Sequence, residues 1–318
     1  MSRVTPHNAT FSRPSAREAL IMVAALTVWL AVTAMFVGYR PEHSFLAVLM
    51  AAMFFASAPT RRIVVALVPF ALFGISYDWM NIVPNYMVNP VDIQGLYETE
   101  KSLFGITVNE TMCLTPNEFF ALHHAPWADF LAGFFYLCWV PVPIIFGLWL
   151  YFDGQRAEYL HFAIVFLLVN LLGFTFYYIH PAAPPWYVAS HGFEFIQGTP
   201  GQVAGLGRFD EMLGVSIFHG LYERNANVFA ALPSLHSAYM LVAFIYALRA
   251  RTPLWMRIAA AVICIGIWAT AVYSSHHYII DVMAGIAVTL LGYALFEYVL
   301  MRIPAFSRFT ARYTKYIS

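Results

Sequence analysis

Eight stretches of almost continuous apolar residues divide the chain, and each is close to the length that crosses a bilayer. Backbone N–H and C=O groups in lipid must bond within their own segment, so we expect every stretch to be a helix. The eight expected helices are about 19–38, 43–59, 63–83, 127–150, 159–179, 233–250, 256–274 and 278–300. The predicted fold class is therefore an all-α, polytopic membrane helix bundle.

Two long segments, roughly 84–126 and 180–232, separate these helices and are rich in Pro, Gly, Asn and aromatic residues. We expect them to be largely non-helical, and segments of this length are uncommon in a compact domain unless they are functional. No internal repeat or low-complexity tract is visible. The expected organisation is an N-terminal tail with two extra transmembrane helices at 1–62, one catalytic membrane domain at 63–300, and a basic tail at 301–318.

Composition agrees with a membrane protein. Apolar residues make up 61% of the chain and charged residues 11%, whereas soluble domains carry about 25% charged residues. The net charge is zero, so no nucleic-acid partner is indicated. The three cysteines form no CxxC pair, which predicts neither a disulfide framework nor a zinc site. The N-terminus is too polar for a signal peptide, so the first apolar stretch is expected to be retained.

Lysine and arginine set the expected orientation, because cytoplasmic loops carry an excess of both. With both termini in the cytoplasm, 13 of these residues lie inside and 4 lie outside, which accounts for all 17. The outside residues are Arg40, Lys101, Arg208 and Arg224. Both long segments then face outward. Compact loops and the lack of a lysine-rich retention tail favour a bacterial inner membrane, with these segments in the periplasm.

A few ionisable residues fall inside or at the ends of the expected helices, namely Asp78, His236, His276, His277, Asp281 and Glu297. Each costs about 2.5–3.5 kcal/mol to insert, so each is a candidate functional residue. Asp78 lies near the outer end of the third span, where it either binds a polar headgroup or faces water. We assign no role to Glu297.

The stretch YSSHHYIIDVMAG contains the most informative pair. His277 and Asp281 are four residues apart, which on a helix places them on one face, one turn apart. A carboxylate there fixes the imidazole tautomer and leaves the other nitrogen as a nucleophile or base. His276 points about 100° away and is the weaker partner. The competing interpretation is a buried histidine that only caps a helix start.

The stretch NVFAALPSLHSAYM places His236 at the start of another expected helix, at the same depth as His277. Pro233 suits a first turn, and free N–H groups at a helix N-terminus favour phosphate. Ser234 adds a hydroxyl donor or is an ordinary N-cap. Trp186 and Tyr187 close a third span as substrate contacts or as interfacial anchors.

A nucleophilic histidine, an orienting aspartate and a second histidine suit phosphoryl transfer. His277 would attack phosphorus, and His236 would protonate the leaving oxygen. Arg224 and Arg208 are the candidate phosphate-binding cations, and no metal or cofactor is expected. Two alternatives stay open, namely a lipid phosphate or diphosphate phosphatase that uses the same residues with water, and a transfer with another headgroup or lipid acceptor. A proton-coupled transporter would need polar residues scattered at mid-depth, whereas here they gather at the outer helix ends.

The motifs ALPSLHSA and SSHHYIIDVMAG resemble the second and third signatures of the type-2 phosphatidic acid phosphatase superfamily. With HPAAPPWY and GTPGQVAGLGRFD, they more narrowly resemble its inositol phosphorylceramide synthase branch. The resemblance covers about residues 78–290 and implies a six-helix membrane core, to which the two N-terminal spans are additions.

The resemblance implies that His277 is the nucleophile, Asp281 its partner and His236 the acid and base. It also implies a reaction, namely transfer of phosphoinositol from phosphatidylinositol to ceramide. Two departures from the phosphatase pattern favour a transferase. Ala271 stands where the general pattern has an arginine, and HPAAPPWY replaces the early lysine-and-arginine motif.

Overall fold

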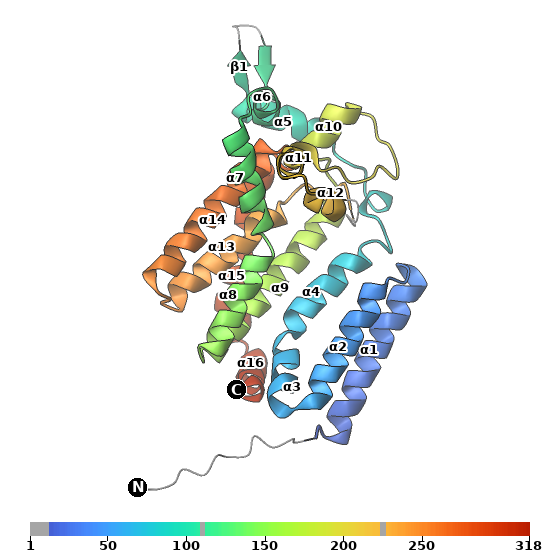
Figure 1. Cartoon of the computed structure of the whole chain (residues 1–318), viewed down its shortest axis with the longest axis vertical. Helices are drawn as coiled ribbons and strands as arrows, with labels where there is room; N and C mark the ends of the chain where they lie inside the picture. The colour runs from blue at the N-terminus through green and yellow to red at the C-terminus, as the bar shows by residue number, and fades with distance from the viewer. Residues whose placement is uncertain (1–12, 109–111, 223–226) are drawn as a thin grey trace.

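The computed structural model describes residues 13–108, 112–222 and 227–318, and its main body is a bundle of helices (Figure 1). All eight predicted stretches are helical, with ends that differ from the prediction by a few residues. The unbent ones are α1 (Ala16–Phe36), α2 (Pro41–Ala56), α9 (Arg156–Ile179), α13 (Leu235–Arg249), α14 (Leu254–Tyr273) and α15 (Ile279–Ala294). The bent ones are the pairs α3–α4 (Ala58–Ala66 and Val68–Trp79) and α7–α8 (Pro126–Leu137 and Pro141–Phe152).

Within the described residues, four helices are long and apolar enough to cross a membrane, and up to six if each bent pair is one span. Helices α2 and α13 are apolar but shorter. The protein is therefore a multi-pass membrane protein.

Prolines mark both bends. Pro69 lies at the start of α4, which is tilted 46° from α3, and Pro141 is the first residue of α8, which is tilted 44° from α7. Proline has no N–H to donate and its ring clashes with the preceding turn, so each helix breaks there. The second break moves residues 138–140 toward the middle of the bundle, where they approach α13.

The hydrophobic core surrounds α9, which packs against α4, α8, α13 and α15. Its side chains are among the most buried in the protein and include Tyr159, Leu160, Phe162, Val165 and Phe166. The α13–α14 and α13–α15 contacts complete the core. These contacts hold the first turns of α13 and α15 side by side at one end of the bundle.

Helices α1 and α2 form a hairpin beside α3 and α4, on the outside of the bundle (Figure 1). Asp78 of α4 attaches this hairpin, because its carboxylate lies 3.4 Å from both Arg40 and His43. The neighbouring Trp79 indole donates to the Thr33 hydroxyl (3.0 Å). Asp78 and Trp79 together therefore hold the two helices of the hairpin onto the bundle.

The segments 80–125 and 180–234 fold together over one end of the bundle, and we call this region the cap (Figure 1). The expectation that they are largely non-helical is incomplete, because short helices alternate with the loops. They contain helices α5 (Gln94–Phe104), α6 (Pro116–Leu122), α10 (Pro185–His191), α11 (Gly207–Leu213) and α12 (Ile217–Tyr222), and the single turns η1 (Asn85–Met87) and η2 (Ala204–Leu206). Strands β1 (Ile106–Val108) and β2 (Met112–Leu114) pair antiparallel.

Backbone hydrogen bonds join the two cap segments. Asp92 pairs with Ala182, and Ala182 pairs in turn with Ala230, so two parallel bridges join three stretches of the chain side by side. The Asp92 side chain also meets His180 (3.1 Å). The cap is consequently one unit, and it ends directly at the start of α13.

The opposite end of the bundle carries α16 (Pro304–Ile317), which follows the short π and 3-10 turns η3 (Leu295–Val299) and η4 (Leu300–Arg302). Helix α16 packs against α3 and α9 and buries Ile317. The Tyr313 hydroxyl donates to Val65 O (2.6 Å). Nearby, Arg249 pairs with Glu297, so Glu297 takes part in an ion pair at this end.

Candidate active site

The two histidines selected from the sequence meet where α13 and α15 begin. His236 is the second residue of α13, and His277 lies in the loop 274–278 between α14 and α15. The His236 Nδ1 and His277 Nε2 atoms are 3.0 Å apart. Two residues 41 positions apart in the chain are thus in direct hydrogen-bond contact.

The partner of His277 on its other side is a backbone carbonyl. Its Nδ1 lies 3.0 Å from Ala231 O and 3.5 Å from Asp281 Oδ2. A carbonyl oxygen only accepts, so Nδ1 carries the hydrogen, and the Nε2 of neutral His277 carries the lone pair. The His236 Nδ1 must then donate to that lone pair.

The expectation that His277 and Asp281 share a helix face is wrong, although the two side chains do meet. His277 precedes α15, whose N-cap is Tyr278, and Asp281 is the third residue of the helix. The Asp281 carboxylate accepts from the Tyr278 N–H (2.8 Å) in a capping arrangement. Asp281 therefore fixes the start of α15 and faces His277 from there.

The loop that carries His277 is held from several sides. The Asn117 side chain of α6 donates to Val272 O (2.8 Å) and to His277 O (2.9 Å). Ser275 has a left-handed backbone (φ 61°), which a non-glycine residue adopts only when its surroundings enforce it. The Trp186 N–H donates to Ser275 O (3.0 Å).

Glu100 of α5 closes the helix start from the cap side. Its fully buried carboxylate accepts from the N–H groups of Ile279 (2.9 Å) and Ile280 (3.1 Å). Burial raises the pKa of Glu100, these two hydrogen bonds oppose that rise, and the nearby Asp281 adds to it. Two carboxylates therefore lie at the positive end of one helix.

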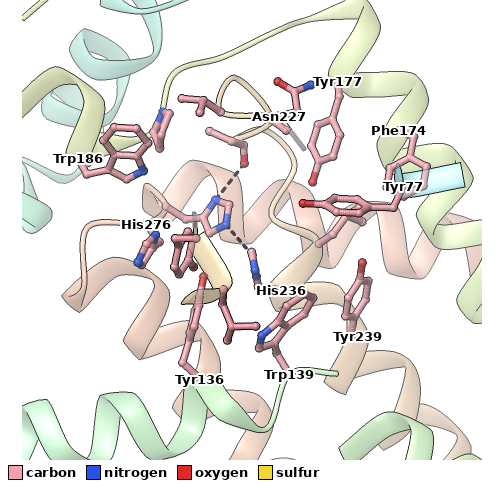
Figure 2. A pocket seen from close by; sticks show the side chains of 18 of the residues that line it. Tyr77, Tyr136, Trp139, Phe174, Tyr177, Trp186, Asn227, His236, Tyr239 and His276 are labelled. Atoms are coloured by element: carbon pink, nitrogen blue, oxygen red, sulfur yellow. Dashed lines mark hydrogen bonds between the residues drawn. The ribbon is translucent and has the colours of Figure 1, made fainter. Parts of the chain in front are cut away.

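A cavity of about 260 Å³ opens beside the two imidazoles, and most of its walls are aromatic (Figure 2). The aromatic side chains come from four helices and the cap, and they are Phe73, Tyr77, Tyr136, Trp139, Phe174, Tyr177, Trp186, Phe218, Tyr222 and Tyr239. The described lining contains no Lys or Arg. A site of this kind suits a ligand with apolar parts and excludes bulk water.

The remaining predicted site residues are distributed unevenly. His276 and Trp186 line the cavity, whereas Ser234, Tyr187, Arg208 and Asp78 do not. Ser234 is the fully buried N-cap of α13 and Pro233 precedes it, outside the first turn. Arg224 lies outside the described residues.

Three of these residues have clear structural partners. The Tyr187 hydroxyl donates to Glu194 O (2.8 Å) inside the cap. Arg208 Nε donates to Asp129 Oδ1 (2.6 Å), and the same oxygen accepts from the Tyr273 hydroxyl (2.8 Å). Asp78 holds the N-terminal hairpin, as described above.

His276 faces the cavity but is a neutral group. Its ring stacks on Tyr222 (4.4 Å between centroids), and its Nε2 lies 3.0 Å from Val203 O. Burial, followed by the neighbouring His277, lowers the pKa of His276 to about 3. At neutral pH it therefore donates from Nε2 and carries no charge.

Sequence reasoning missed four residues that shape the site, namely Glu100, Asn117, Tyr136 and Trp139. The indole of Trp139 packs against the His236 ring edge (4.4 Å) and stacks on Tyr239. Tyr136 and Trp139 flank the break between α7 and α8, and the VPVP stretch in a long apolar run was the signal for that break. Nothing in the sequence marks Glu100 or Asn117, because the cap fold alone brings them to the loop.

Within the described residues, no group of three or more His, Cys, Asp or Glu side chains is placed to hold a metal ion.

Several known proteins match the chain over long stretches. The chain is 58% identical over 304 residues to a phosphoinositol dihydroceramide synthase of Bacteroides thetaiotaomicron, covering 96% of this chain and 99% of the relative. It is 27% identical over 216 residues to the inositol phosphorylceramide synthase catalytic subunit of Saccharomyces cerevisiae, covering 66% and 49% of the two chains. An inositol phosphorylceramide synthase of Candida albicans is 32% identical over 176 residues, covering 51% and 35%.

No solved structure matches the chain. The family profile described as the PAP2 superfamily matches residues 106–295, more than half of the chain and all of the region around the paired histidines. The chain therefore belongs to the PAP2 superfamily, the type-2 phosphatidic acid phosphatase superfamily that its motifs resemble.

Proposed function

We propose that this protein is a membrane lipid phosphotransferase that moves phosphoinositol from phosphatidylinositol to ceramide and releases diacylglycerol. The observation that carries this proposal is the His236–His277 contact (3.0 Å) beside an aromatic cavity. The lipids come from the relatives, because the bacterial one is named a phosphoinositol dihydroceramide synthase and the fungal ones inositol phosphorylceramide synthases. The dihydroceramide form is the first acceptor to test.

In the first step, the Nε2 lone pair of His277 attacks the phosphorus of the donor. A P–N bond forms, the P–O bond to diacylglycerol breaks, and His236, protonated on both ring nitrogens when the anionic donor is bound, gives one proton to the leaving oxygen and becomes neutral. His236 already points a donor at the attacked position, so the donor's phosphoryl group would replace His277 Nε2 as its partner. Asp281 would stabilise the positive imidazole ring of His277 across 3.5 Å.

In the second step, the primary hydroxyl of ceramide gives its proton to His236 and attacks phosphorus. The P–N bond breaks, the new P–O bond forms, and both histidines return to their starting protonation states. Water would produce hydrolysis at this stage. The aromatic walls favour transfer over hydrolysis, because they offer water few polar partners.

We further propose that both chain ends lie in the cytoplasm and that the cap faces the periplasm of a bacterial inner membrane. The distribution of 13 and 4 basic residues supports this orientation. The same reasoning divides the chain into the N-terminal tail and hairpin (1–62), the catalytic domain (63–300) and a tail (301–318). Most of that tail forms α16 and packs against the bundle.

The test uses purified protein in detergent with phosphatidylinositol and a fluorescent ceramide or dihydroceramide, with EDTA and no added metal. We expect a new polar fluorescent lipid on a thin-layer plate. The His277→Ala variant should lose nearly all of it, whereas His123→Ala, which changes an exposed histidine of the cap, should retain it.

Two outcomes would redirect the proposal. If intact wild-type protein forms no new lipid from phosphatidylinositol, phosphoinositol transfer is wrong, and phosphate release from phosphatidic acid would then indicate a phosphatase. Product that disappears only in EDTA would show that the reaction needs a metal.

A further inference from the structure

The walls of the cavity contain one buried hydroxyl whose partner among the described residues is only another hydroxyl. Tyr136 is 1% exposed, and its hydroxyl meets that of Tyr222, which also lines the cavity. Among the described residues, no backbone carbonyl and no carboxylate accepts from the Tyr136 hydroxyl. A charged oxygen of a ligand in the cavity would be a stronger acceptor than a phenol.

Neighbouring tyrosines of the same cavity behave differently. The Tyr177 hydroxyl donates to Pro233 O (3.0 Å), and the Tyr239 hydroxyl donates to Asn170 Oδ1 (2.6 Å). Those two hydroxyls hold helices together. The Tyr136 hydroxyl instead meets the hydroxyl of Tyr222, a second side chain of the cavity wall.

The position of Tyr136 is set by two histidine rings. Its ring stacks on His236 (5.0 Å between centroids, 25° between planes) and on His276 (5.5 Å, 22°). Figure 2 shows its hydroxyl rising between these two side chains, toward the middle of the cavity. Because the ring is clamped, the hydroxyl direction is fixed before any ligand arrives.

We propose that the Tyr136 hydroxyl donates a hydrogen bond to an oxygen of the reacting phosphoryl group and is therefore a further catalytic residue. The inference rests on the proposed function, since it places the phosphorus between His236 and His277. Negative charge on the phosphoryl oxygens grows as the P–N bond forms, and a donor fixed in a dry site stabilises it. The described lining supplies no Lys or Arg for this task, which leaves part of it to the phenol.

The Tyr136→Phe variant separates this role from a structural one, because it keeps the stacked ring and removes only the hydroxyl. Removal of the hydroxyl loses only its contact with Tyr222, so the melting temperature should fall little. Loss of one phosphoryl donor should lower kcat by about 10²- to 10³-fold. The loss of activity should therefore far exceed the loss of stability.

The matched control is Tyr313→Phe, far from the cavity, whose hydroxyl donates to Val65 O. This variant should have a lower melting temperature and wild-type kcat. A Tyr136→Phe variant with wild-type kcat and vanadate affinity would overturn the proposal.

Orthovanadate, which mimics a five-coordinate phosphoryl group, tests Tyr136 without reference to the lipids. We expect vanadate to inhibit the wild type, and its inhibition constant to rise at least tenfold in Tyr136→Phe. If the wild type binds vanadate but makes no inositol lipid, the proposed function fails while the role of Tyr136 is still measured.

A second measurement covers the case in which the variant does not fold. With 3-fluorotyrosine placed at position 136, the fluorine resonance should move when vanadate is added. A resonance that vanadate leaves unchanged, in protein that vanadate inhibits, would also overturn the proposal.

Discussion

At the scale of single residues, the site pairs the two histidines that we propose as nucleophile and acid. The His277 Nε2 accepts from the His236 N–H, so one hydrogen bond joins the two imidazole rings. Both rings are buried or nearly so, and neither has to shed a water shell before it reacts. The donor lipid has only to replace one imidazole contact.

The buried, neutral His276 predicts that the folded protein loses stability as the pH falls. Its pKa is about 3 in the folded protein and about 6.5 in an unfolded chain, so the unfolded chain takes the proton first as the pH falls. This contribution to stability is complete above pH 6.5 and is lost progressively toward pH 3, at about 1.4 kcal/mol per pH unit. The melting temperature of the wild type should fall accordingly.

The His276→Gln variant should flatten that dependence. The glutamine amide can still donate to Val203 O but does not titrate. Melting temperatures measured in detergent from pH 8 to pH 4 should converge for the two proteins at low pH, while His123→Gln should follow the wild type. Parallel curves for wild type and His276→Gln would contradict the assignment.

The sequence predicted those site residues that are ionisable and lie in apolar surroundings. His236, His277 and Asp281 stand out because ionisable groups at helix ends in an apolar chain are costly. Tyr136 does not stand out, since tyrosine is ordinary in an apolar run and only the fold brings its side chain to the cavity. Asp78 was the opposite case, because it is unusual in the sequence but serves an ion pair.

At the scale of elements, the distance between α13 and α15 decides whether the histidines meet. The backbones touch, because the Ser234 N–H donates to Asp281 O (2.9 Å). A Cβ at Gly285 would lie 2.2 Å from Ser234 O, so only glycine permits this approach.

The Gly285→Ala variant should therefore push α15 away from α13. Overpacking of this kind costs about 1–3 kcal/mol, and a shift of about 1 Å at the site can lower turnover by about 100-fold. Gly74→Ala in α4 is the matched control, because nothing lies within 4 Å of the added methyl group. Melting temperature and product formation should be measured for both variants. Equal values for the two would contradict the requirement for glycine at position 285.

Element prediction succeeded for long apolar helices and failed for the cap. Length and hydropathy are sufficient for a membrane span, since lipid leaves the backbone no alternative to a helix. The cap helices are short, from six residues in α12 to eleven in α5, and contacts with neighbouring segments decide their conformation. Pro and Gly in those segments indicated breaks but not the helices between them.

At the scale of the whole molecule, one natural cysteine tests the proposed orientation. Cys113 is exposed on β2 of the cap, whereas Cys138 and Cys264 are partly or fully buried. In spheroplasts of a bacterial host, a membrane-impermeant maleimide should label Cys113, and the signal should disappear in Cys113→Ser.

Labelling that appears only in inside-out vesicles would invert the orientation. The distribution of basic residues predicts the orientation. It does not predict how the cap folds over the site. That closure depends on contacts between residues some 90 positions apart, such as Asp92 with Ala182, which no local pattern encodes.

Because the acceptor for His277 Nδ1 is the main-chain carbonyl of Ala231, it does not depend on which amino acid occupies position 231. Every amino acid supplies the same main-chain oxygen, and that oxygen does not titrate in any solution a cell meets. The acceptor that sets the tautomer of His277 therefore persists through codon changes that keep the chain path, and through acidification of the medium. A substitution at position 231 can therefore change the bulk beside His277 but not the acceptor that its Nδ1 requires.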